Sequence, residues 1–253
     1  MITPLATISP ALLHAVAVFI AGSAVALVGL HTGMLAIAGA RTPLSPRTRA
    51  FAPVIAALVL GGWLGWALVE AQQRALVGPV SGPQSPVQAL PTLAAIVVSI
   101  AIGAAFLASR TMRTLNAAIP SDWLIRVQVY RAAGIVFLWP FMLNGTLSAG
   151  FALPAGIGDA VTGLAAPFVA LAVAQRRPGA YGWAVAWNWF GLADLVVAPT
   201  AAVLSGTQLA AIHPLGLIPL FLGPPLGILT HIYSLRNLAV NRTLLSPVPV
   251  NGS

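Results

Sequence analysis

The chain has 253 residues, of which 58% are hydrophobic and only 6% are charged. Soluble domains carry roughly 25% charged residues, so this composition excludes a soluble fold and predicts an all-α protein embedded in a membrane. The 12 basic side chains are all arginines spread over several loops, which does not indicate a nucleic-acid partner, and the absence of cysteine excludes disulfides and thiolate metal sites.

Seven segments are long and apolar enough to cross a bilayer, which takes about 20 residues each. We therefore expect a polytopic bundle of seven spans that forms one transmembrane domain over residues 1–243, followed by a short tail over 244–253. The stretch before Arg41 has no charged side chain, and we interpret it as one tilted helix. The approximate spans are 11–34, 51–70, 91–109, 124–146, 156–175, 181–203 and 214–234.

The arginines alternate between the predicted loops. They occur in 41–50, in 110–123, at 176–177 and after 234, whereas the opposite side receives only Arg74. Short loops rich in arginine stay in the cytoplasm, so the pattern predicts an outside N-terminus and an inside C-terminus, as in a bacterial inner-membrane protein. The segment 71–90 is rich in Gly, Pro and Ser and predicts an irregular external loop, and no amphipathic surface helix is expected.

The fourth predicted span carries Gln128 and Arg131 on one helical face, three residues apart. The simplest interpretation is that the Arg131 side chain snorkels to the cytoplasmic interface. The alternative is a contact with an anion or a lipid headgroup. Asn144 lies at the outer end of the same span.

Two aspartates lie inside the fifth and sixth spans, where an ionisable group costs about 2.5–3.5 kcal/mol and needs a reason. Asp159 is expected near the outer end of the fifth span, and Asp194 in the outer half of the sixth, with Asn188 deeper. A tight turn should pack these spans antiparallel, so both acids would face an outward-open polar pocket, lined also by Asn188 and Asn144, that binds a proton, a cation or a polar solute. The alternative is a structural role, with Asp159 capping the start of its helix.

The last span contains Gly223-Pro224-Pro225-Leu226-Gly227. This double proline should break the helix near its middle, and broken helices at mid-depth are used for ion or substrate sites as well as for static kinks. The break favours transport modestly.

The four residues Gly156-Ile157-Gly158-Asp159 resemble the GxGD motif of the presenilin and signal-peptide-peptidase type of intramembrane aspartyl protease. The resemblance implies catalysis by two carboxylates, here Asp159 and Asp194. In that family, however, the partner aspartate precedes the motif, whereas Asp194 follows it. The Pro-Ala-Leu of that family stands near the end of its chains, but here it occupies residues 10–12.

Histidines on the first and last spans raise a second alternative, a b-type haem electron carrier, because two facing histidines can hold haem iron. We predict no cofactor as the main interpretation. In that alternative the ligands would be His14 and His213 towards the outside, and His31 and His231 towards the inside.

The sequence thus favours a transporter or channel-like protein for a small solute or proton over an enzyme. The intramembrane protease, the haem carrier and a non-catalytic scaffold subunit remain open alternatives. The expected partners are the lipid bilayer and a small polar solute or proton.

Overall fold

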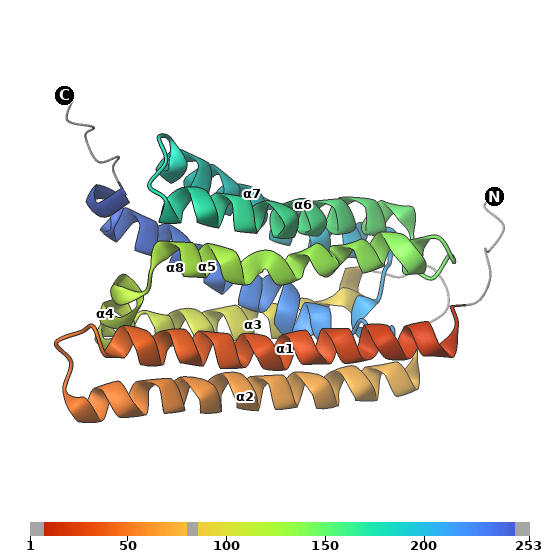
Figure 1. Cartoon of the computed structure of the whole chain (residues 1–253). Helices are drawn as coiled ribbons and strands as arrows, with labels where there is room; N and C mark the ends of the chain where they lie inside the picture. Colours follow the sequence, from red (N-terminus) through yellow and green to blue (C-terminus); the bar gives the residue numbers. More distant parts are fainter. Residues whose placement is uncertain (1–7, 80–85, 246–253) are drawn as a thin grey trace.

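The computed structural model describes residues 8–79 and 86–245. These ranges hold seven helices long and apolar enough to cross a membrane and contain no strand, which confirms the predicted all-helical multi-pass fold. The helices run side by side; the first described helix begins at one end of the bundle, and the last span ends at the other (Figure 1).

Most spans are longer than the hydropathy pattern indicated. The first, α1, has 30 residues and is therefore about 45 Å long, which exceeds the hydrocarbon core of about 30 Å. The spans are α1 (Pro10–Gly39), α2 (Pro46–Val77), α3 (Leu90–Leu107), a helix over Ser121–Met142 that begins with α5 (Ser121–Arg126), α6 (Ala149–Ala174), α7 (Ala180–Ser205) and a helix over Ile218–Val240 that ends with α8 (Gly227–Val240).

The expected irregular loop over 71–90 is wrong for residues 71–77. There α2 continues, because Arg74 pairs with Glu70 one helical turn earlier and Ala75 and Leu76 are good helix formers. A short 3₁₀ turn over Pro86–Ala89 then leads into α3. Most of the predicted tail, residues 246–253, lies outside the described residues.

A short amphipathic helix, α4 (Arg110–Ala118), was not expected from the sequence. Ser109 caps it by accepting a hydrogen bond from the Met112 amide at 3.3 Å. The helix buries Met112 and Leu115, whereas Arg110 and Arg113 are exposed. Nine residues with two arginines carry too little apolar character for a spanning pattern, so hydropathy alone missed it.

The predicted antiparallel packing of the fifth and sixth spans is confirmed, since α6 and α7 pack along each other from a tight turn at 176–179. The other face of α6 lies against the segment 127–134. The two backbones approach so closely that a Cβ at Gly163 would overlap the backbone of Ala132. The expected face of small residues on this span therefore permits a close helix contact.

Two spans break at proline, as predicted for the last one. In that span Gly223 leaves helical geometry before Pro224 and Pro225, with φ −73° and ψ −113°. Pro224 has no N–H, so the Leu220 carbonyl loses its helical partner, and it accepts instead from the Trp63 indole N–H of α2 at 3.2 Å. Trp139 likewise leaves helical geometry before Pro140.

The arginine-rich segments gather at one end of the bundle. Figure 1 shows the α1–α2 turn, α4, the α6–α7 turn and the end of α8 on the left, and the C-terminal end of α2, which carries Arg74, on the right. The alternation inferred from the sequence therefore corresponds to a spatial separation of charge.

Candidate functional site

Arg131 lies near the middle of its span and is buried, with 3% of its surface exposed. Its Nε donates a hydrogen bond to Asp159 Oδ1 on α6 at 2.7 Å, and its Nη2 forms an ion pair with Asp194 on α7. Its Nη1 points to the Gly191 carbonyl at 3.3 Å and to His231 Nε2 on α8 at 2.9 Å. One guanidinium therefore joins four spans.

His231 continues this cluster on its other side. Its Nδ1 lies 2.9 Å from Asn188 Oδ1, and Asn188 Nδ2 donates to Ser234 Oγ at 3.1 Å and to the Ala184 carbonyl at 2.8 Å. The Trp187 ring packs against the imidazole with centroids 5.0 Å apart. We call Arg131, Asp159, Asp194, His231, Asn188 and Ser234 the central cluster.

Glycines make room for the central cluster. A Cβ at Gly158 would overlap the Asp194 carboxylate, and one at Gly191 would overlap the His231 ring. A Cβ at Gly134 would overlap that of Asp159. The polar side chains of the central cluster thus occupy space that is available because these three positions are glycine.

A polar stripe runs along α8 from the central cluster towards the arginine-rich end. After His231 and Ser234 comes Asn237, whose Oδ1 accepts from the Ser121 hydroxyl at 2.5 Å and whose Nδ2 donates to the Ile119 carbonyl at 2.9 Å. Asn241 then donates to the carbonyl of Ala117 in α4 at 3.2 Å. The spacing of three to four residues keeps these side chains on one helical face.

A cavity of about 380 Å³ reaches the central cluster from the opposite end of the bundle. Asp159 lines its wall, together with Phe137 and Phe151, whose rings meet edge to face with centroids 5.4 Å apart. Glu70 and Arg74 also line it; Arg74 Nε donates to Glu70 Oε1 at 2.7 Å, and its Nη1 donates to Thr92 Oγ1 on α3 at 2.6 Å. We call this space the Asp159 cavity.

The structure brings together three of the residues selected for an outward polar pocket and leaves one apart. Asp159, Asp194 and Asn188 belong to the central cluster, although only Asp159 lines the cavity. Asn144 lies beyond the end of its span, where its Oδ1 accepts from the Thr146 amide at 3.0 Å. Asp159 lies inside α6, which begins at Ala149, so the alternative that it caps this helix is wrong.

Arg131 turns inward to the two aspartates and does not snorkel. Gln128, on the same face, is fully buried; its Nε2 points to the Gly227 carbonyl at 3.4 Å, and its Oε1 has no hydrogen-bond partner among the described residues. Arg131 lies at least 28 positions from either aspartate in the sequence, so the sequence did not indicate that these side chains pair. The informative signal was that one basic and two acidic residues all fell inside spans, where charges normally pair.

The sequence-based interpretation did not predict that His231 belongs to a polar stripe on the last span. The repeat His231, Ser234, Asn237 and Asn241 at intervals of three and four is the pattern that could have shown a polar helix face in the last span.

The geometry bears on the two rival chemistries. A protease dyad needs two carboxylates that share a proton, whereas here each carboxylate is held by a different nitrogen of Arg131. A haem ligand needs an open ring nitrogen: both nitrogens of His231 have partners, whereas in His31 Nδ1 lies 2.7 Å from the Leu27 carbonyl and Nε2 lies 3.3 Å from the Thr230 hydroxyl. His14 and His213 are exposed.

No curated protein and no solved structure is similar enough to this chain to count as a match. A family model described as a domain of unknown function, DUF8737, matches residues 87–239. The matched region holds every residue of the central cluster, whereas α1 and α2 precede it. Because the match covers more than half of the 253 residues, the chain belongs to the DUF8737 family.

Proposed function

We propose that the protein moves protons, alone or together with a small solute, across a bacterial inner membrane, and that the Asp159 cavity is its external entrance. The N-terminus would lie outside and the C-terminus inside, because the arginine-rich end of the bundle belongs in the cytoplasm. The Asp159 cavity, at the opposite end, would then open outward.

The charge of the central cluster is the observation that carries this proposal. Arginine can only donate hydrogen bonds, so His231 Nε2 accepts from Arg131, and the ring is neutral with its proton on Nδ1, facing Asn188 Oδ1. One positive guanidinium then faces the two carboxylates of Asp159 and Asp194. If both are ionised, the cluster carries one excess negative charge, which is costly in a medium of low dielectric constant.

A proton or a small cation removes that cost, and Asp159 is the acid that such a particle can reach. Its side chain is 15% exposed, against 6% for Asp194, and it lines the cavity. Its Oδ1 is bonded to Arg131, whereas its Oδ2 forms no hydrogen bond with any described residue. Binding of a particle at Oδ2 would compete with the hold of Arg131 on this carboxylate.

The polar stripe on α8 supports movement beyond the cluster. Hydrogen bonds link Arg131 to His231, His231 to Asn188 and Asn188 to Ser234, and Asn237 continues the stripe one turn later. Proton relays in membranes use chains of Asp, Glu and His side chains, and Asp159, Asp194 and His231 are groups of this kind.

The test is proton flux in vesicles that contain the purified protein and an internal pH-sensitive dye, under an imposed membrane potential. We expect wild-type flux above that of protein-free vesicles, loss of the excess in Asp159→Asn, and retention in the matched variant Asp122→Asn. Asp122 pairs with Arg126 at 3.2 Å outside the central cluster. Equal flux in Asp159→Asn and wild type would overturn the proposal.

A binding measurement covers the case in which net flux needs a co-transported solute. Infrared difference spectra recorded between two pH values report the carbonyl stretch of a protonated carboxylic acid. We expect this band in the wild type and its loss in Asp159→Asn but not in Asp122→Asn. A titration without a band that depends on Asp159, together with no flux, would leave a scaffold role and refute proton handling.

The proposed orientation has its own test, which the absence of cysteine makes direct. Thr146 and Pro178 are exposed and lie in the turns before and after α6. In intact cells an impermeant maleimide should label Thr146→Cys and spare Pro178→Cys. The reverse pattern would place the Asp159 cavity on the cytoplasmic side.

A further inference from the structure

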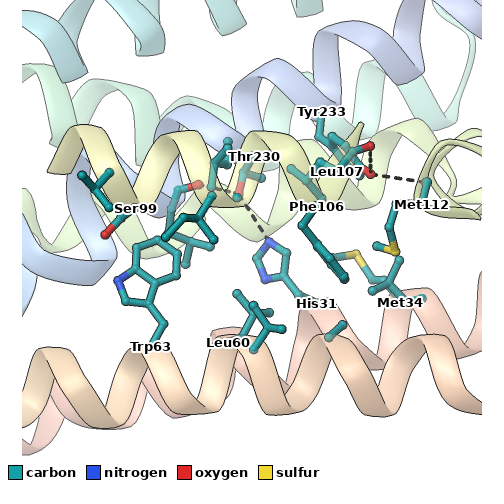
Figure 2. Close-up of a pocket in the computed structure, with 18 of the residues that line it drawn as sticks. His31, Met34, Leu60, Trp63, Ser99, Phe106, Leu107, Met112, Thr230 and Tyr233 are labelled. Atoms are coloured by element: carbon teal, nitrogen blue, oxygen red, sulfur yellow. Dashed lines mark hydrogen bonds between the residues drawn. The ribbon is translucent and has the colours of Figure 1, made fainter. Parts of the chain in front are cut away.

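A second cavity, of about 530 Å³, lies between the α1–α2 hairpin and the pair α3 and α8. Figure 2 shows His31 and Trp63 on the hairpin side, facing Thr230 and Phe106 across it. Its volume falls within the range of about 300–1,000 Å³ typical of small-molecule sites. We call this space the His31 cavity.

The lining of the His31 cavity excludes a charged ligand. Among the described residues that line it there is no aspartate, glutamate or arginine, and aliphatic and aromatic side chains dominate. It is also separate from the Asp159 cavity, because the two share no lining residue. The occupant that fits is therefore a neutral, mainly apolar molecule.

The side of the cavity between α2 and α3 connects it to the bilayer. These helices follow each other in the sequence but scarcely contact one another; each packs instead on the broken last span. Trp66 on α2, and Val98 and Ile102 on α3, line the cavity and are exposed on the surface that faces lipid. A hydrocarbon chain can thus enter sideways from the membrane without crossing water.

One polar position inside the cavity is incompletely satisfied. His31 Nδ1 lies 2.7 Å from the Leu27 carbonyl, which can only accept, so Nδ1 carries the proton and Nε2 of the neutral ring is an acceptor. The nearest donor to Nε2 is the Thr230 hydroxyl at 3.3 Å, but that hydroxyl has one hydrogen and lies closer, at 2.8 Å, to the Leu226 carbonyl. Nε2 therefore lacks a full donor within an apolar cavity.

We propose that the His31 cavity binds a neutral membrane lipid bearing a free hydroxyl group, with one hydrocarbon chain between α2 and α3 and the hydroxyl donating to His31 Nε2. The apolar walls bind the chain, and the partly buried acceptor selects for a hydroxyl over a plain hydrocarbon. This site is independent of proton movement through the central cluster.

The probe is a long-chain alcohol carrying a photoactivatable diazirine, added to the full-length protein in lipid nanodiscs. The corresponding diazirine alkane, which lacks the hydroxyl, serves as the second probe. After illumination, mass spectrometry locates and quantifies the labelled peptides. We expect the alcohol to label the parts of α2 and α3 that line the cavity more than other lipid-facing helix surfaces.

Two variants separate the hydroxyl contact from the cavity itself. His31→Phe keeps a ring but removes the acceptor, so alcohol labelling in the cavity should fall about fivefold, as expected for one lost hydrogen bond, and alkane labelling should not change. Ala94→Trp adds a large side chain at an exposed α3 residue that lines the cavity, and it should reduce labelling by both probes. The matched change Ala104→Trp, at an exposed α3 residue outside the cavity, should reduce neither.

Even labelling of all lipid-facing helices would overturn the proposal, as would alcohol labelling that is the same in wild type, His31→Phe and Ala94→Trp. Thr230→Val provides a check if His31→Phe fails to fold. It removes the Thr230 hydroxyl that Nε2 contacts, leaves this acceptor without a donor among the described residues, and should increase alcohol labelling. A decrease would contradict the assignment of Nε2 as the acceptor for the ligand.

Discussion

In α1 and α2, 22% of the most apolar stretch is buried inside the protein, whereas in the last span, Ile218–Val240, the corresponding share is 72%. The last span is surrounded by other helices and carries His231, Ser234 and Asn237. The hairpin is exposed over most of its apolar surface, and the ion pair that it contains among the described residues, between Glu70 and Arg74, lies near its end. In α7 the corresponding share is also 22%, yet its Asn188 and Asp194 are individually buried, so polar side chains in this fold lie where protein covers them.

The two regions contribute differently to the two cavities. The central cluster belongs to the five later spans, although Glu70 and Arg74 of α2 also line the Asp159 cavity, whereas the His31 cavity takes about a third of its lining residues from the hairpin. If the comparison is correct, changes in the central cluster should affect the whole fold, and changes in the hairpin should have smaller, local effects. The four changes below test this, from the largest expected effect to the smallest.

Arg131→Met should be the most damaging change. It leaves Asp159 and Asp194 buried without a counter-ion, and removing one partner of a buried ion pair costs about 3–5 kcal/mol in the free energy of unfolding. Arg126→Met is the matched control, because that arginine is exposed in its pair with Asp122 and should cost less than about 1 kcal/mol. Denaturant titration in detergent micelles measures both.

The same denaturant titration also tests whether the two unpaired carboxylates cause the loss of stability in Arg131→Met. Adding Asp159→Asn and Asp194→Asn to Arg131→Met removes the two charges that lost their partner, so part of the stability should return. Equal losses in Arg131→Met and Arg126→Met would mean that the central cluster is not a buried ionic unit.

Gly163→Ala tests the close contact between α6 and the segment 127–134. Its Cβ would overlap the Ala132 backbone, which cannot move aside as a side chain can, so we expect a loss of about 3 kcal/mol, at the upper end for overpacking. Gly182→Ala in α7 meets no atom within 4 Å and should be neutral or slightly stabilising. The midpoint of thermal unfolding distinguishes them, and a tolerated Gly163→Ala would show that the helices can separate without cost.

Asn188→Leu should remove the support of His231 while keeping the arginine and both acids. It leaves His231 Nδ1 and Ser234 Oγ without this partner. Because buried polar groups left unsatisfied are destabilising, the free energy of unfolding should fall by about 2 kcal/mol. Asn144→Leu is the matched control, since that residue holds only an exposed turn. Similar unfolding free energies for the two variants would contradict the extension of the central cluster through His231.

The sequence was sufficient for the number and order of the spans because each requires only length and apolarity. It also predicted the break at Pro224 and the small-residue face around Gly163, since both follow from local chemistry. It did not predict that Arg131 lies between Asp159 and Asp194, because this contact depends on how three spans rotate about their axes. Hydropathy carries little information on rotation in helices that are apolar on nearly all sides.

Trp63→Phe should have the smallest effect and tests the hairpin directly. Pro224 deprives the Leu220 carbonyl of its helical donor, and the Trp63 indole N–H replaces it at 3.2 Å, while the ring meets Phe221 edge to face at 4.9 Å. Phenylalanine keeps most of the ring contact and loses the hydrogen bond, so the cost should be about 1 kcal/mol.

If the hairpin is a local addition to the five later spans, this loss should increase amide hydrogen exchange around the Gly223 break and in α2, and leave α6 and α7 unchanged. Trp66→Phe, on the same helix but more exposed to lipid, should change neither region. Faster exchange in α6 or α7 would show that the hairpin supports the central cluster as well. The hairpin and the broken last span would then form one structural unit with Arg131, and the distinction between the two regions would fail.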